Sequence, residues 1–373
     1  RVRSRQPRTL TAPAGPSVRV GVMPRIFRGV LVALATVVVG VSGCTTTPSG
    51  PPQTTITWPQ ETSDALRLLL VGSGSTLYAV WGDRSVVIAG PQGTPTPTRL
   101  PKDDQQPGSE TPQQIAVDPS GQVWLIRSNQ QVTTFLGVDH PASAAVSELG
   151  RGSITLPTGR VVPDRLVSED GLAILDGTTL LASTYTGGRT LNPDQDVLIN
   201  RVTASGHDEV AGRWRTNPPD PLSGVPEGTS VPAGSVDLGV VRRVAALAPD
   251  RIAFVVGTVS GTIKRDSRLS LAVLEAGTVR RVPIPGLCPS DYDATLVRLS
   301  DRVVLLGAPA PRDNGECRSV SAARTWLRVD VVDGTSQVLA TDTETLAVVG
   351  DRIVTATTTH VVDTWTTRIT WGS

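Results

Sequence analysis

The sequence predicts an all-β chain, a single β-propeller of six four-stranded blades that follows an N-terminal signal peptide and a tether. Two observations predict this fold. The composition is rich in Val, Leu, Ile and Thr and has 36 Gly and 30 Pro among 373 residues, which suits short strands joined by tight turns and disfavours long helices. A strand–turn–strand pattern also recurs about every 50 residues, a period typical of propeller blades.

The N-terminal 43 residues differ from the rest of the chain in charge and hydropathy. They hold seven Arg and no acidic residue, and without these seven the chain has 28 basic residues against 34 acidic ones. We interpret residues 1–22 as a non-structural extension and residues 23–43 as a signal peptide. Arg25 and Arg28 precede an apolar stretch, 29–41, that is shorter than the ~20 residues needed to cross a bilayer. An uncleaved N-terminal membrane helix is the alternative.

Cys44 follows this stretch in the order Val41, Ser42, Gly43, Cys44, which resembles the lipobox of bacterial lipoproteins. The resemblance implies that the Cys44 thiol receives a diacylglyceryl group and that signal peptidase II cuts before it. Acyl chains such as palmitate then anchor the chain, and two of them give stable membrane attachment. We therefore expect a lipoprotein on the extracytoplasmic face of the cell membrane. The Arg- and Ala-rich, Lys-poor composition is typical of a high-GC bacterium such as an actinomycete.

Residues 44–64 are rich in Thr and Pro, which predicts an extended tether, and residues 65–373 carry the repeat. In each of six units an apolar strand ends in a small turn and a second apolar strand follows. Aligned on the first apolar residue after the turn, the units fall 46, 57, 72, 51 and 50 residues apart, at Leu77, Val123, Leu180, Ile252, Val303 and Ile353. A pair of β-sandwiches is the alternative fold, but the nearly even period favours the propeller.

The rest of each period fits a second hairpin. Apolar segments flank Asp333-Gly334 in the fifth unit and Ala276-Gly277 in the fourth, and both dipeptides are typical of two-residue turns. The segment IAVDPSGQVWLI, 115–126, resembles the inner-strand motif of NHL- and TolB-like propellers. The segments TTITWP, 54–59, and TRITWG, 367–372, are alike, and either could form the outer strand of a terminal blade.

Two cysteines remain beyond the lipobox. Cys288 lies in a connection between two predicted blades, and Cys317 lies in the loop between the second and third strands of the fifth blade. Propeller topology places both connections on one face. An exported chain is expected to pair its cysteines, so we predict a Cys288–Cys317 disulfide, with a reactive thiol as the alternative.

Acidic residues in the predicted loops could hold a metal ion. Asp194 and Asp196 lie in one loop, and Asp291 and Asp293 follow Cys288. Carboxylate oxygens are ligands that Ca²⁺ prefers, although solvated acidic loops are the other interpretation. Five further Asp residues sit at the first turn of successive units, and we interpret them as turn caps rather than a catalytic ring: Asp118, Asp176, Asp250, Asp301 and Asp351.

The function classes that remain are few. The mildly acidic body has no basic stripe, which excludes a nucleic-acid partner. The chain has no G-x-S-x-G elbow, Walker loop or H-E-x-x-H motif, and we predict no catalytic residue and no cofactor apart from Ca²⁺ at the acidic loops. We expect a protein that binds a protein, peptide or envelope ligand through its loop-rich face. A Ca²⁺-dependent propeller enzyme, similar to lactonases or sugar dehydrogenases, is the alternative, and a purely structural envelope protein is a third.

Overall fold

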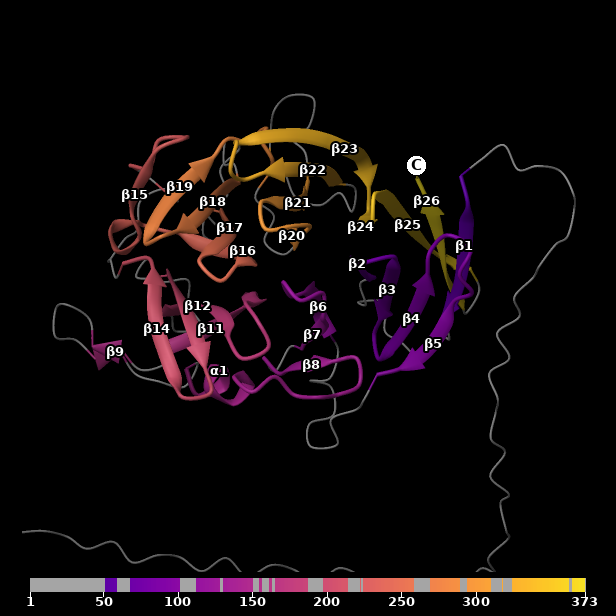
Figure 1. Ribbon diagram of the computed structural model, residues 1–373, viewed down its shortest axis with the longest axis horizontal. Coiled ribbons are helices and arrows are strands. Elements are labelled where there is room, and N and C mark those ends of the chain that lie inside the picture. Colours follow the sequence, from indigo (N-terminus) through magenta and orange to yellow (C-terminus); the bar gives the residue numbers. More distant parts are fainter. Residues whose placement is uncertain are drawn as a thin grey trace, which may run out of the picture. The chain divides into compact units, whose positions relative to one another are not determined.

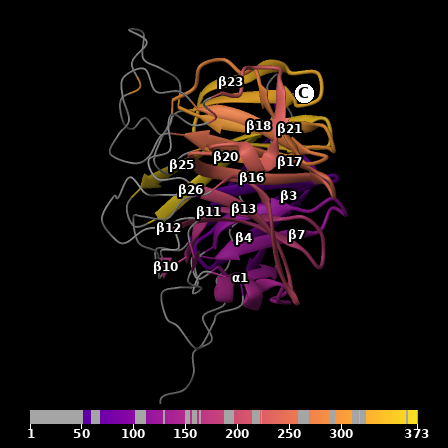
Figure 2. The same cartoon turned by 90° about the vertical axis from the view of Figure 1, so that its left-hand side faces the viewer.

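The computed structural model describes one propeller within the unit Thr46–Ser373. The described residues are 51–58, 68–100, 112–127, 130–149, 154–155, 161–162, 165–186, 197–213, 222, 224–257, 269–288, 294–309, 317, 324–361 and 364–372. Six antiparallel sheets follow one another around a central axis (Figure 1, Figure 2). The predicted β-propeller is therefore confirmed.

Counted outward from the axis, the three described strands of blade 2 and the first four strands of blades 1, 3, 4 and 5 follow chain order. Blade 1 contains β2 (Leu69–Ser73), β3 (Thr76–Trp81), β4 (Arg84–Ala89) and β5 (Thr96–Arg99), and blade 2 contains β6 (Pro112–Val117), β7 (Val123–Arg127) and β8 (Val132–Thr134). Blade 3 contains β11 (Arg165–Ile174), β12 (Leu180–Thr186), β13 (Val197–Thr203) and β14 (Gly206–Ala211). Blade 4 contains β16 (Val240–Ala248), β17 (Arg251–Gly257), β18 (Ser270–Glu275) and β19 (Thr278–Val282). Blade 5 contains β20 (Thr295–Arg298), β21 (Val303–Ala308), β22 (Arg324–Asp330) and β23 (Thr335–Thr343).

Two blades depart locally from the four-stranded pattern. The described part of blade 2 has three strands, and the short helix α1 (Ser143–Leu149) follows them and packs its buried Val146 and Leu149 against the core between blades 2 and 3. Blade 4 gains a fifth strand, β15 (Ser230–Pro232), which pairs with the outer strand β19 and leads into the 3₁₀ helix η1 (Ala233–Ser235). A separate two-stranded sheet pairs β9 (Ile154–Thr155) with β10 (Val161–Val162).

The ring closes through the N-terminal strand. Blade 6 consists of β24 (Thr345–Val349), β25 (Arg352–Val361), β26 (Thr364–Trp371) and, outermost, β1 (Gln53–Trp58), which pairs with β26 in antiparallel register. The two similar sequence segments therefore both form strands of blade 6. Residues 367–371 lie in β26, the third strand, and residues 54–58 lie in β1, the fourth strand. The predicted boundary of the tether, 44–64, is wrong at this point. Ile56 and Trp58 alternate with exposed Thr55 and Thr57, the period-two pattern of a strand with one buried face.

Aromatic contacts fasten this closing strand to blade 1. The indole Nε1 of Trp58 donates a hydrogen bond to Oγ1 of Thr367, 2.8 Å away. The ring of Trp81, at the end of β3, lies 6.4 Å from that of Trp58 and 5.2 Å from that of Trp365 between centroids. At the axis the inner strands β2 and β24 approach so closely that a Cβ added to Gly72 would lie 1.9 Å from the Val348 carbonyl oxygen, so only glycine fits there.

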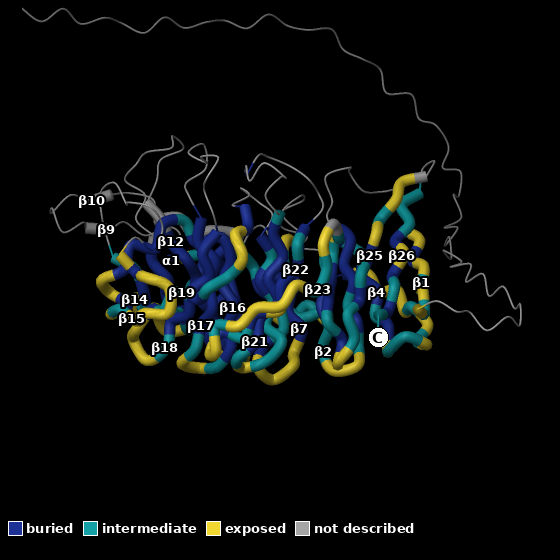
Figure 3. Tube along the Cα trace, turned by 90° about the horizontal axis from the view of Figure 1, so that it is seen from above, coloured by how far each residue is buried: buried dark blue, intermediate teal, exposed yellow. Residues whose placement is uncertain are grey.

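Chain order gives the propeller two different faces. We call the face that carries the connections between blades and between second and third strands the loop face. The opposite face, here called the turn face, carries the turns that join first to second strands and third to fourth strands. Figure 3 shows the ring edge-on, with exposed turns along one face and the C-terminal end of the chain on that same side.

The turns on the turn face confirm part of the capping prediction. Asp118 Oδ1 accepts hydrogen bonds from the amides of Ser120 and Gln122. Asp176 Oδ1 accepts hydrogen bonds from the amides of Thr178 and Thr179. In the fifth blade the cap is a serine instead: Ser300 Oγ accepts from the amides of Arg302 and Val303.

Candidate functional site

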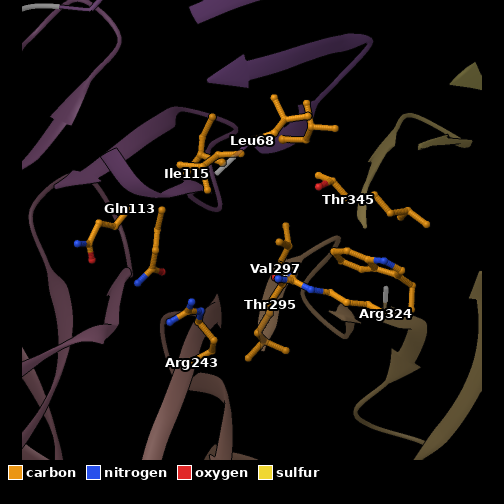
Figure 4. A pocket seen from close by; sticks show the side chains of 14 residues that line it. Leu68, Gln113, Ile115, Arg243, Thr295, Val297, Arg324 and Thr345 are labelled. Carbon is orange, nitrogen blue, oxygen red and sulfur yellow. Dashed lines mark hydrogen bonds between the residues drawn. The ribbon is translucent and has the colours of Figure 1, made fainter. Parts of the chain in front are cut away.

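The inner strands begin at the loop face, and their first residues surround a cavity at the end of the central channel. We call this cavity the channel mouth. Blades 1, 2, 5 and 6 each contribute the start of their inner strand, and blade 4 contributes Arg243 from within β16 (Figure 4). The lining residues are Leu68–Leu70, Gln113–Ile115, Arg243, Thr295–Val297, Arg324, Trp326, Thr345 and Leu346.

Two buried guanidinium groups give the channel mouth its chemistry. Arg243 is 8% exposed and Arg324 is 6% exposed. Nη1 of Arg324 donates to Oγ1 of Thr295 at 2.8 Å, and Nη1 of Arg243 donates to the carbonyl oxygen of Arg242 at 3.1 Å. Arginine stays protonated at any physiological pH and offers five N–H donors. The channel mouth is therefore a donor-rich site.

Neutral polar groups share the cavity with the two arginines. Figure 4 shows Gln113 and Arg243 on one side of the cavity and Arg324 and Thr345 on the other. The described lining set includes no carboxylate. These side chains can donate hydrogen bonds to the oxygens of an anion or of a carbonyl group.

The volume of the channel mouth limits what can enter it. The cavity measures about 60 Å³, which gives room for about four water molecules at ~15 Å³ each on this measure. Sites that enclose a drug-sized ligand have about 300–1,000 Å³. The described part of the channel mouth therefore has room for a single small group, such as a carboxylate or phosphate.

A second, smaller cavity of about 30 Å³ lies beyond the first. Ile115, Leu296 and Val297 line both cavities, together with the polar Gln114. The charged side chain that lines the deeper cavity is that of Arg298, whose Nε donates to the carbonyl oxygen of Leu247 at 3.2 Å. Burial lowers the pKa of Arg298, while the negative charges of Asp301 and Asp118 act in the opposite direction. Arginine side chains thus line the axis at both depths.

The predicted disulfide is confirmed. Cys288 and Cys317 are bonded, with 2.07 Å between their sulfurs and 5.2 Å between their Cα atoms. Both residues are buried, and the Cys288 amide donates to the carbonyl oxygen of Pro309 at 2.9 Å. The bond joins the connection between blades 4 and 5 to a loop of blade 5, and both belong to the loop face.

The other predicted site residues lie outside the described residues. These are the lipobox residues Val41, Ser42, Gly43 and Cys44 and the acidic residues Asp194, Asp196, Asp291 and Asp293. Lipidation and Ca²⁺ binding therefore stay predictions. Within the described ranges, no group of three or more His, Cys, Asp or Glu residues could hold a metal ion. In the same part of the chain, no helix has both the length and the apolar character needed to cross a membrane.

His140 has a structural role at the junction of blades 2 and 3. Its side chain is buried, and its Nε2 lies 2.8 Å from the carbonyl oxygen of Asp176, so this nitrogen carries the proton. Its Nδ1 accepts a hydrogen bond from the Ala142 amide at 3.2 Å. The ring stands edge-on to Trp124, with 5.0 Å between centroids. Burial lowers the pKa of His140, against the opposing effects of the Asp176 carbonyl and of nearby carboxylates.

Sequence reasoning missed the residues of the channel mouth. One signal was present, because Arg242 and Arg243 interrupt the otherwise apolar segment VVRRVAALA that forms β16. Gln113 and Gln114 similarly precede the apolar part of β6. Polar residues at matching ends of inner strands would have predicted a polar site on the axis. No sequence signal indicates that Arg324, from a third strand, reaches the same cavity.

Comparisons with known proteins reveal similarity in fold. No family model matches the chain, and no curated protein matches it. Among solved structures, TolB from Acinetobacter baumannii matches 81% of this chain over 63% of its own length, with 10% identity and a TM-score of 0.35. The β-propeller domain of the Trilobed protease from Pyrococcus furiosus matches 78% of each chain with 11% identity and a TM-score of 0.32. An α-L-arabinanase from Penicillium chrysogenum, complexed with arabinobiose, matches 87% of this chain and 98% of its own with 12% identity and a TM-score of 0.43.

Proposed function

We propose that this chain is a lipid-anchored, extracytoplasmic β-propeller that binds a protein, peptide or envelope ligand at its loop face. The observation that supports binding is the channel mouth, where two buried arginines and neutral polar groups line one small cavity open to that face. Guanidinium groups recognise carboxylate and phosphate oxygens through charge-assisted hydrogen bonds. The ligand therefore presents an anionic group, held at the axis, while the rest of it lies across the surrounding loops.

The disulfide supports the extracytoplasmic location. Disulfides persist in oxidising compartments and are rare where glutathione and thioredoxin keep thiols reduced. The Cys288–Cys317 bond is buried and joins two connections of the loop face, which is typical of a structural disulfide in an exported protein. Together with the lipobox at Cys44, it favours an exported, membrane-attached chain.

The Ca²⁺-dependent enzyme has no comparable support at the channel mouth. Calcium sites are built from six to eight oxygen ligands, with carboxylates prominent among them. Among the described residues that line this cavity, the charged groups are instead the guanidinium groups of Arg243 and Arg324, which cannot ligate a cation.

The anchor is tested by mass spectrometry of the full chain extracted from membranes. We expect the mature N-terminus to be Cys44 carrying a diacylglyceryl group, and we expect Cys44→Ala to abolish both lipid labelling and cleavage. A membrane-extracted chain that retains residues 23–43 would contradict lipid anchoring.

Ligand binding is tested by cross-linking the detergent-solubilised full chain to bacterial envelope extracts and then measuring the affinity for the captured ligand. Arg243→Gln removes one charged donor, and a hydrogen bond to a charged group contributes about 1.5–3 kcal/mol. The affinity should therefore fall roughly 10- to 150-fold. Asp351→Asn, an exposed change on the turn face, is the matched control. If Asp351→Asn weakens binding and Arg243→Gln does not, the ligand binds elsewhere and the proposal is wrong.

A further inference from the structure

The N-terminal segment enters the propeller from the turn face. Strands β24 and β25 are joined at Gly350 and Asp351 on that face, so β25 runs toward the loop face and β26 returns. β1 is antiparallel to β26, which places Gln53 opposite Thr370 at the turn-face end and Trp58 at the loop-face end. The Trp371 amide donates to the Pro52 carbonyl oxygen at 2.9 Å, which holds the entering chain at this edge.

The length of the tether decides which face lies nearer to an anchor at Cys44. Nine residue steps separate Cys44 from Gln53. They span at most about 32 Å when fully stretched and average about 16 Å as a flexible coil. The six residues of β1 alone extend about 20 Å. If the loop face were toward the membrane, the tether would have to run back past β1 and would use most of its stretched length to do so. If the turn face is toward the membrane, the tether needs no such extension.

The turn face also presents exposed apolar side chains. Leu136 is 86% exposed and Val138 is 61% exposed, both in the turn that follows β8, and Val332 is 42% exposed in the turn between β22 and β23. The turn that carries Leu136 is fixed. Phe135 packs on Tyr78 of blade 1 with 5.1 Å between ring centroids. The Thr134 amide donates to the Val138 carbonyl oxygen, and the Val138 amide donates to Oγ1 of Thr134. These apolar tips are therefore held outward.

Three turns of the turn face each carry one acidic and one basic residue. They join the first and second strands of blades 4, 5 and 6 and hold Asp250 with Arg251, Asp301 with Arg302, and Asp351 with Arg352. Arg251 also pairs with Glu275, and Arg302 pairs with both Asp330 and Asp333, so acidic residues are in excess on this face of blades 4 and 5. Contact with a lipid surface therefore depends on the apolar side chains and the tether rather than on attraction to anionic headgroups.

We propose that the turn face docks on the lipid surface of the anchoring membrane, with Leu136 and Val138 entering the headgroup region. The channel mouth on the loop face then points away from the membrane, toward ligands outside the cell. This inference rests on the proposed function, because the lipid at Cys44 supplies the anchor.

Three single-cysteine variants of the full chain test this orientation, since the native cysteines are either acylated or disulfide-bonded. Each is labelled with bimane and reconstituted in vesicles of phosphatidylcholine and phosphatidylglycerol that contain a headgroup nitroxide lipid. Leu136→Cys reports on the turn face, and Thr359→Cys reports on the loop-face end of β25. Val338→Cys is the matched control, because Val338 is 51% exposed but lies on the outer strand β23 rather than in a turn.

We expect strong quenching and a blue-shifted emission at position 136, and little of either at positions 338 and 359. Stronger quenching at 359 than at 136, or equal quenching at all three positions, would overturn the orientation. Flotation of the vesicles separates this outcome from a failure of the proposed function. A chain that floats but is quenched at 359 overturns the orientation alone, whereas a chain that does not float with the vesicles overturns both.

Discussion

Ring closure by β1 makes a quantitative prediction at Trp58. This side chain is 2% exposed, packs against Trp81 of blade 1 and donates to the Thr367 hydroxyl of β26. Trp58→Ala therefore removes a contact between blades and a hydrogen bond within blade 6. Truncating a buried Trp to Ala costs about 3–5 kcal/mol. The Thr367 hydroxyl keeps a second partner, the Thr358 hydroxyl at 3.0 Å, so the lost hydrogen bond adds little to that cost.

The prediction is measured by urea unfolding and by native-state hydrogen exchange of the full chain. We expect the free energy of unfolding to fall by about 3–5 kcal/mol, and we expect the β26 amides that pair with β1 to lose protection first. Thr57→Ala, at an exposed neighbouring position of β1, is the control and should change stability by less than about 0.5 kcal/mol. A loss below about 1 kcal/mol in Trp58→Ala, or unchanged protection in β26, would refute closure through β1.

Two further predictions concern the disulfide and the buried histidine. The bonded cysteines are 29 residues apart, and the loop-closure relation gives about 3.6 kcal/mol for that separation. The double variant Cys288→Ser with Cys317→Ser should lose stability of this order in urea unfolding, and a stability equal to that of the native chain would contradict a structural disulfide. Burial lowers the pKa of His140 below its usual value of 6.5, so the unfolded chain binds more protons as the pH falls through 6.5. Stability should therefore be full above pH ~6.5 and decline toward pH ~5. His140→Gln should be less stable at pH ~8, but its stability should change less over this window.

The hairpins could be predicted from the sequence because their determinants are local. Turn dipeptides such as Ala276-Gly277 adopt the positive φ angles, 48° and 74°, that two-residue hairpin turns require, and apolar runs flank them. The closing strand could not be assigned in this way. Its five-residue core TTITW sits in a Thr- and Pro-rich segment. Trp58 bonds to Thr367, which is 309 positions away. The segment forms a strand because it pairs with β26, and the local sequence does not reveal this pairing.

The channel mouth was hidden for a similar reason. Its polar side chains come from inner strands and one third strand of different blades, so no spacing along the chain brings them together. The pair Arg242 and Arg243 was the available signal, since a charged side chain within an apolar strand must face either solvent or a polar interior site. The disulfide, in contrast, could be predicted because only two cysteines remained once Cys44 was assigned to the lipid.

Closure of the ring and orientation of the propeller depend on the same strand. β1 is paired with β26 along its whole length. Tension on the tether therefore acts on a strand that is held in a sheet by six residue pairs, not on an unpaired chain end. The antiparallel register also fixes the direction in which β1 runs, and thereby places the entry of the tether on the turn face. A change that frees β1, such as Trp58→Ala, should then lengthen the effective tether by the released residues. The bimane label at position 359 should become accessible to the nitroxide headgroups as the propeller loses its fixed orientation, although the anchor at Cys44 is intact. Loss of stability without any change in quenching would separate the two roles of β1 and would show that contacts of the turn face alone hold the orientation.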